Sequence, residues 1–126
     1  MTEKNEKQGA EKNVILCGAN SYQQKYYFND QFKLLPENIK KELQIMCVLF
    51  TEDVGGTLFL EFSPEGNLEF RVEAEDQDYL FDEIGSGLKI RQYQREKKEL
   101  LESLELFYRV VFLGDKLEDQ LDKQGE

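Results

Sequence analysis

Alternating hydrophobic and polar positions predict a β-hairpin in the middle of the chain. Two segments, 57–62 and 68–74, alternate, and Pro64 and Gly66 lie between them. Proline suits the second position of a type I turn, and glycine suits the left-handed residue that follows it. The register set by this turn places six apolar side chains on one face of the hairpin, namely Leu58, Leu60, Phe62, Leu68, Phe70 and Val72. We therefore expect this face of the hairpin 57–74 to lie in the core.

Helical periodicity predicts two longer elements. The first is a helix at about 36–54, which begins with a proline and ends before two glycines. Its segment 45–50 is apolar all round, which favours burial on more than one side. The second is a long helix at about 88–113, roughly 40 Å long at 1.5 Å per residue. Its apolar stripe is interrupted by Lys97, so we expect the half that follows, from Leu100 to Val111, to pack on the core.

Three shorter segments complete the picture. Residues 14–17 form a compact apolar run and predict a buried strand, which a turn at Gly18-Ala19-Asn20-Ser21 would close. Residues 22–28 are ambiguous between strand and helix, and their aromatic content favours the strand. A short helix over 78–84 is also compatible with the pattern, with Gly85-Ser86-Gly87 as a break or flexible joint before the long helix.

Together these elements predict an α+β fold. We expect an antiparallel sheet of three or four strands with the two principal helices packed on one face. A single domain would span residues 13–114. Residues 1–12 would form a disordered N-terminal tail, and the acidic segment 115–126 would be a frayed C-terminal tail.

Composition removes several classes of function from consideration. The 126 residues include 16 Lys and Arg against 26 Asp and Glu, so the formal net charge is −10. This balance argues against binding nucleic acid or an anionic membrane, because both need clustered cations. No His is present, which removes Ser-His and Cys-His nucleophile pairs and His metal ligands. The sequence has no apolar run of 18 residues, so no membrane span is expected.

The two cysteines, Cys17 and Cys47, are 30 positions apart in apolar surroundings. Such a pair supplies too few ligands for a zinc site. We interpret both as reduced, buried thiols of a cytoplasmic protein, in preference to a disulfide. No cofactor, metal site or catalytic residue is indicated.

Charge is distributed unevenly along the chain. Residues 52–83 hold 11 acidic side chains and a single base, Arg71. Bases gather instead at the start of the predicted long helix, at Lys89, Arg91, Arg95, Lys97 and Lys98. Either the basic helix start pairs with the acidic segment, or the acidic segment is a patch for a basic partner.

The outer face of the hairpin supplies the candidate contact surface. The register places Glu61 opposite Glu69, and Phe59 opposite Arg71, whose guanidinium could stack on the ring. Facing carboxylates repel, so Glu61→Lys is expected to stabilise the isolated protein. We take the candidate protein-contact surface to be Phe59, Glu61, Glu69, Arg71, Glu73, Glu75, Asp76 and Asp78. The alternative is a plain solvated face.

Two motifs near this surface lead to no known ligand site. Asp76-Gln77-Asp78 resembles the start of an EF-hand loop, but Phe81 and Gly87 stand where that loop needs Gly and Glu. A looser divalent-cation site among these carboxylates stays open. Gly85-Ser86-Gly87 lacks the third glycine of a dinucleotide-binding fingerprint.

Several segments resemble a family of small uncharacterised bacterial proteins known only as a domain of unknown function. They are Cys17 to Asn20, Lys25 to Asn29, Cys47 to Gly56, Asp82 to Gly87 and the helix from Leu100 to Gly114. The resemblance covers about residues 13–114 and implies a bacterial, cytoplasmic protein without an assigned activity. The order of elements is also broadly similar to that of some small bacterial immunity proteins.

These observations favour a small acidic, non-enzymatic protein-interaction module. An immunity-type inhibitor of a basic toxin enzyme is the alternative, and a small carboxylate-based or metal-dependent enzyme is the third. The expected partner is a protein, in the sharper hypothesis a basic one. The chain itself would be a monomer, or a homodimer through the long helix.

Overall fold

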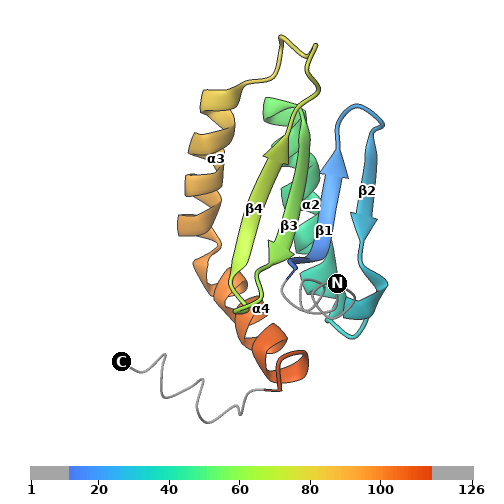
Figure 1. Ribbon diagram of the computed structural model, residues 1–126, viewed down its shortest axis with the longest axis vertical. Helices are drawn as coiled ribbons and strands as arrows, with labels where there is room; N and C mark the ends of the chain where they lie inside the picture. Colours follow the sequence, from blue (N-terminus) through green and yellow to red (C-terminus); the bar gives the residue numbers. More distant parts are fainter. Residues whose placement is uncertain (1–11, 115–126) are drawn as a thin grey trace, which may run out of the picture.

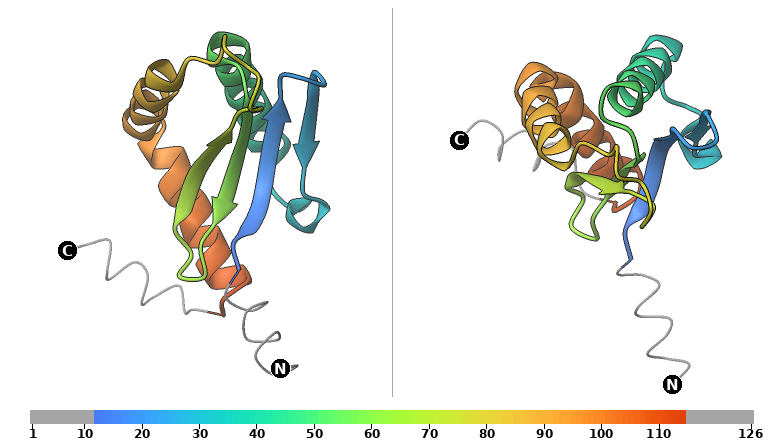
Figure 2. Two further views of the ribbon diagram at one scale, coloured as in Figure 1. Left: turned by 45° about the horizontal axis from the view of Figure 1, so that its top comes forward. Right: turned by 90° about the horizontal axis from the view of Figure 1, so that it is seen from above.

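The computed structural model describes residues 12–114 as a four-stranded antiparallel sheet with helices packed on one face (Figures 1 and 2). The elements follow in the order β1 (Val14–Asn20), β2 (Lys25–Phe28), η1 (Asp30–Phe32), α2 (Glu37–Val54), β3 (Thr57–Phe62), β4 (Leu68–Glu73), α3 (Glu83–Glu96) and α4 (Lys98–Val111). The strand order in the sheet is β2-β1-β3-β4. The predicted α+β class is confirmed. The predicted tails lie outside the described residues, except for Lys12.

The β3–β4 hairpin has the predicted register. Leu60 pairs with Phe70 and Leu58 with Val72. The turn is closed by the Ser63 backbone N–H, which donates to the Asn67 carbonyl at 2.8 Å. Gly66 has φ of 91°, which is the left-handed conformation that its place in the turn requires. Turn chemistry and hydrophobic alternation agreed here, and both were right.

The first two strands differ from the prediction at their ends. β1 continues through Gly18 and Ala19 to Asn20, three residues beyond the predicted strand. The reason lies at Gly18, where a Cβ would come within 2.7 Å of the Leu58 carbonyl oxygen on β3. Glycine is therefore required by the close approach of two strands, and does not mark a turn. The strand interpretation of 22–28 is confirmed for β2, while the three residues before it form the turn.

Helix α2 has the predicted bounds and the predicted buried stripe. Leu43, Met46 and Phe50 are buried against the sheet. The expectation that 45–50 is buried on several sides was wrong, because Ile45 and Leu49 are 57% and 52% exposed. These two residues lie on the side of the helix that faces away from the strands.

The predicted long helix consists of two helices that meet at Lys97 (Figure 2). Lys97 leaves helical geometry, with φ of −106° and ψ of 24°, and its Nζ lies 2.9 Å from Glu42 Oε2 on α2. Gly85-Ser86-Gly87 lies inside α3 and is not a joint between helices, which corrects that expectation. Val111, expected in the core, is 56% exposed. As expected, α4 buries more apolar side chains than α3.

An aromatic stack closes the core between α4 and the sheet. The Tyr108 ring of α4 lies 4.2 Å from the Phe62 ring of β3, and Phe32 of η1 lies 5.6 Å from Phe62.

Cys17 and Cys47 are free and buried in the same core, with their Sγ atoms 3.8 Å apart. None of the helices in the described part of the chain is both long and apolar enough to span a membrane.

Candidate functional site

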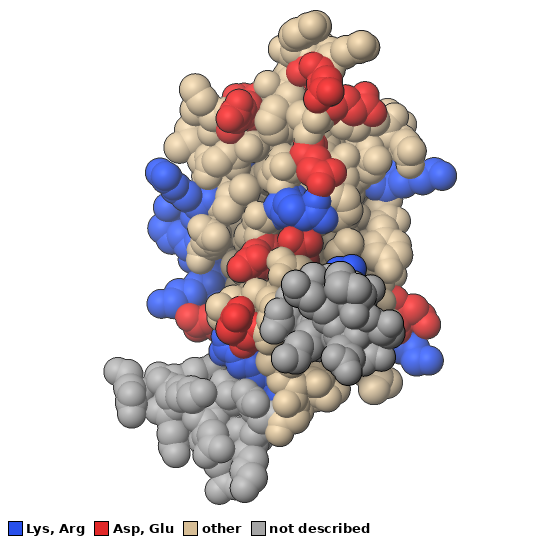
Figure 3. Space-filling model, in the orientation of Figure 1, with Lys and Arg blue, Asp and Glu red and all other residues tan. Residues whose placement is uncertain are grey.

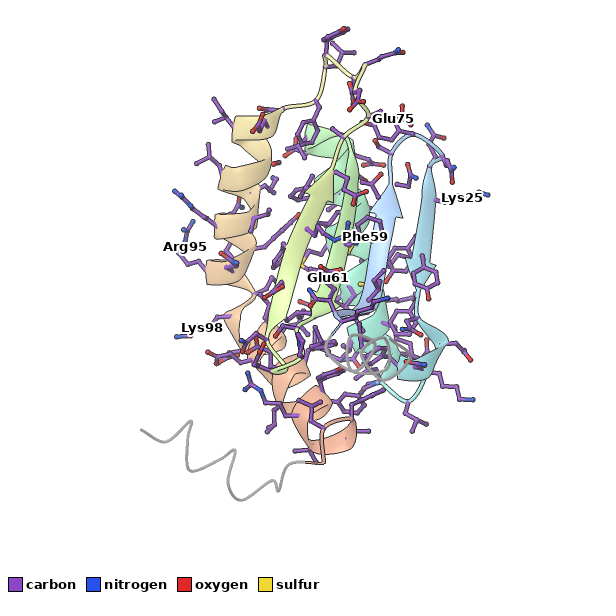
Figure 4. The ribbon with its side chains drawn as sticks, in the orientation of Figure 1. Lys25, Phe59, Glu61, Glu75, Arg95 and Lys98 are labelled. Carbon is purple, nitrogen blue, oxygen red and sulfur yellow. The ribbon has the colours of Figure 1, made fainter. Side chains whose placement is uncertain are left out.

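The sheet face opposite the helices carries most of the candidate contact surface (Figure 4). The outward positions of β3 hold Phe59 and Glu61, and those of β4 hold Glu69, Arg71 and Glu73. The register pairs Phe59 with Arg71 and Glu61 with Glu69, as predicted. Among residues 12–114, no helix covers this face of the sheet (Figure 2).

Glu61 is the most buried carboxylate of this face, with 7% of its surface exposed. Its Oε2 accepts a hydrogen bond from Arg71 Nε at 3.1 Å and another from Asn13 Nδ2 at 3.0 Å. The same Asn13 amide group donates to Glu69 Oε1 at 3.1 Å. One amide thus bridges the two facing carboxylates, and the guanidinium neutralises the inner one.

This arrangement corrects the expected effect of Glu61→Lys. The prediction assumed that Glu61 and Glu69 repel each other without compensation. In the structure Glu61 has two donors, and a lysine in its place would set an ammonium group beside Arg71. The substitution is therefore expected to destabilise the protein.

The predicted stacking of Arg71 on Phe59 is confirmed. The guanidinium carbon lies 4.2 Å from the centre of the ring, a distance at which a cation is attracted to the aromatic face. Arg71 also forms an ion pair with Glu73. Phe59 is half-buried and packs over Gly18, which explains an aromatic side chain on the open side of the sheet.

The loop after β4 carries the other three predicted residues, and Tyr22 fixes its base. The Tyr22 hydroxyl donates to Asp78 Oδ2 at 2.5 Å and accepts from the Glu75 backbone N–H at 3.0 Å. The hydrogen bond to Asp78 raises the pKa of Tyr22 above its ordinary value. Glu75 and Asp76 point into solvent. Asp78 therefore positions the loop, while Glu75 and Asp76 are free to contact a partner.

Acidic side chains run across the sheet face and along this loop, and basic side chains follow the edge formed by α3 (Figure 3). Ion pairs within the protein neutralise some of these charges. Lys89 Nζ lies 2.7 Å from Asp53 Oδ2, and Lys97 pairs with Glu42. Arg91 and Arg95 form no ion pair with any other residue that the structure describes.

Sequence reasoning missed three highly exposed apolar residues near the acidic loop. Tyr79 and Leu80, in the acidic loop, are 89% and 93% exposed, and Ile84 at the start of α3 is 79% exposed. All three were expected within a helix over 78–84. In the structure α3 begins only at Glu83, with Asp82 as its N-cap, so Tyr79 and Leu80 lie in a loop. A signal was present, since an aspartate three residues before Gly85 suits a helix cap.

Carboxylates and thiolates are the side chains of this protein that could ligate a metal ion. Within residues 12–114, no cluster of three or more such side chains has a geometry that could hold a metal ion. The Asp76–Asp78 segment binds its own loop and Tyr22 instead. The surface is thus built of ion pairs and exposed carboxylates on a rigid sheet.

Residues 13–116 match a family described as a family of unknown function, DUF6145. No curated protein and no solved structure matches the chain.

Proposed function

Since this chain belongs to the family of unknown function DUF6145, whose description assigns no activity, we propose a function from its surface: a protein-interaction module that binds a partner with a basic surface. The observation that carries the proposal is the acidic segment 52–83, with 11 acids and one base. Such a surface steers and orients a partner of opposite charge. Two free, buried thiols support the cytoplasm as its compartment.

The candidate contact surface divides into support and contact residues. Arg71 donates a hydrogen bond to Glu61 and stacks on Phe59, so these three residues support the sheet face. The exposed carboxylates are Glu69, Glu73, Glu75 and Asp76, which follow one another on β4 and the loop after it. A partner would therefore meet a line of carboxylates along the edge strand.

The test is affinity capture from the native host with charge-reversed variants. Glu69→Lys combined with Glu75→Lys reverses two exposed carboxylates of the proposed surface. The matched control, Glu99→Lys combined with Glu102→Lys, makes the same change in net charge on exposed positions of α4. We expect the first variant to lose its specific partner and the control to keep it. Equal loss in both variants would show that only net charge matters and would contradict the proposal.

An immunity-type inhibitor is the second candidate, because the same acidic surface would fit over a basic enzyme. In that case the captured partner is an enzyme, and adding the purified protein abolishes its activity. A captured partner that is not inhibited would leave the general interaction role and remove this one. An enzymatic role ranks third, because Glu61 and Glu69 share Asn13 as a structural bridge.

A further inference from the structure

The outer side of α3 carries a stripe of exposed side chains. Ile84, Leu88, Arg91 and Arg95 follow at spacings of four, three and four, so they share one side of the helix. The buried residues of α3 lie on the opposite side. Ile84 and Leu88 are 79% and 60% exposed, and Arg95 points away from the sheet (Figure 4). The first half of the stripe is therefore apolar and the second half basic.

The two ends of this stripe have opposite charge. Exposed Asp82 and Glu83 lie at its start, and Arg91 and Arg95 lie at its end. A second copy of α3 running antiparallel would bring each acidic end beside the other copy's arginines. The same pairing lays the aliphatic stems of Arg91 and Arg95 on the partner's Leu88 and Ile84. The stripe is thus complementary to itself, as a twofold interface requires.

Gly87 is a second, independent feature of this surface. It lies in the second turn of α3, one turn from Ile84 and from Arg91, and is exposed. Nothing lies within 4 Å of the place where its Cβ would be, whereas a Cβ on Gly85 would meet the Asp82 cap at 2.2 Å. The fold therefore explains Gly85 but not Gly87, although glycine weakens a helix interior. A second helix that approaches closely would explain it.

We propose that two copies of this chain pair through antiparallel α3 helices, with Ile84, Gly87, Leu88, Arg91 and Arg95 at the interface. A second copy fits the stripe better than a partner of uniform charge, because the two ends of the stripe differ in sign. Tyr79 and Leu80, also highly exposed, belong to the loop that leads into the start of α3 (Figure 1). This inference does not rest on the proposed function, because its interface residues lie on α3, whereas the candidate contact surface lies on the hairpin and the loop after β4.

Sedimentation equilibrium of the full chain tests the pairing. We expect a mass of twice 14.8 kDa at micromolar concentration and low salt. Leu88→Asp should raise the dissociation constant by about tenfold or more, because a carboxylate replaces a central apolar contact. Ile45→Asp is the matched control, since Ile45 is similarly exposed but lies on α2. Circular dichroism verifies that both variants are folded.

A charge exchange gives the sharper test. Glu83→Arg alone and Arg95→Glu alone should each weaken the dimer, because each sets like charges against each other. Mixing the two variants should restore association, because each mixed dimer has two complementary pairs. Lys33→Glu, on an exposed position near η1, should leave the dimer unchanged.

Gly87→Ala separates helix stability from pairing. The alanine should raise the melting temperature of the dilute monomer, because alanine favours the helix, and should weaken the dimer through its added methyl group. Three results would overturn the proposal. They are a monomeric wild-type protein up to millimolar concentration, equal effects of Leu88→Asp and Ile45→Asp, and no association in the charge-exchange mixture.

Discussion

At the scale of single residues, Glu61 shows how a carboxylate can be buried on the open face of a sheet. Its position on β3 places it between Arg71 and Asn13, which donate one hydrogen bond each. Burying an ion costs solvation energy unless hydrogen bonds replace the water. The cluster of Phe59, Glu61 and Arg71 therefore depends on every member being present.

Replacing Glu61 tests this dependence. We expect Glu61→Lys to lower the free energy of unfolding by about 1–3 kcal/mol, since it removes the acceptor of two part-buried hydrogen bonds and adds a cation beside Arg71. Urea denaturation monitored by circular dichroism provides the measurement. Glu69→Lys, at an exposed position, should change the free energy by about 0.5 kcal/mol or less. A more stable Glu61→Lys protein would mean that repulsion between the carboxylates dominates after all.

At the scale of elements, the break at Lys97 divides the C-terminal part of the chain between two tasks. α4 buries Leu101, Leu104 and Tyr108 against the core, whereas the apolar residues Ile84 and Leu88 of α3 remain exposed. In a single continuous helix, the packing of its C-terminal half on the core would also set the direction of its N-terminal half. The break lets α3 run along α2 while α4 packs beneath the sheet (Figure 2).

Leu104→Ala tests the packing of α4. Leu104 is 2% exposed, and truncating such a side chain is expected to lower the free energy of unfolding by about 2–5 kcal/mol. Thermal and urea unfolding both report the change. Val111→Ala, at an exposed position of the same helix, is the control and should have little effect. A melting curve like that of the wild type for Leu104→Ala would show that α4 is not docked as described.

The sequence predicted elements well where two signals agreed. In the hairpin, alternation and the Pro64–Gly66 turn pointed to one register, and that register is present. At Gly18 the composition alone suggested a turn, because the close approach of β3 comes from a segment far along the chain. Lys97 was recognised as an interruption of the stripe, but its ion-pair partner, Glu42, lies on another helix. In both cases the residue's partner lies far away in the sequence.

In the candidate site, too, contacts within the hairpin were predicted, whereas contacts with distant segments were missed. The hairpin register placed Phe59, Glu61 and Arg71 on one face, so that their mutual contacts followed from local spacing. Asn13 was assigned to no element, although it bridges two carboxylates. The anchor of the acidic loop, Tyr22, comes from the turn between β1 and β2. Neither role can be inferred without knowing that β1 pairs with β3.

At the scale of the whole molecule, three tyrosines and one cysteine make stability depend on alkaline pH. A hydrogen bond with Cys17, together with burial, raises the pKa of Cys47. Burial raises the pKa of Tyr26, Tyr93 and Tyr108. In each case the folded protein holds a proton that the unfolded chain releases between about pH 8.5 and 10. The unfolded state then binds fewer protons, so stability must fall as the pH rises.

We therefore expect the free energy of unfolding to decline from about pH 8.5 upward. Each of these groups contributes up to about 1.4 kcal/mol per pH unit while its unfolded form is ionised and its folded form is not. Urea denaturation between pH 7 and 11 provides the measurement. Tyr26→Phe should flatten the decline, because it removes one titrating group. A free energy that stays constant to pH 11 would contradict the assignment.

The sheet order also determines how the chain can fold. β1–β2 and β3–β4 are each local hairpins, but Val14 pairs with Phe62 and Asn20 with Thr57 across the whole of α2. Loop closure over such a distance costs entropy before any contact forms. Two hairpins should therefore form early and join late, when α2 brings β1 against β3. Pulsed hydrogen exchange during refolding should protect the amides between β3 and β4 before those between β1 and β3, and simultaneous protection would indicate a single concerted step.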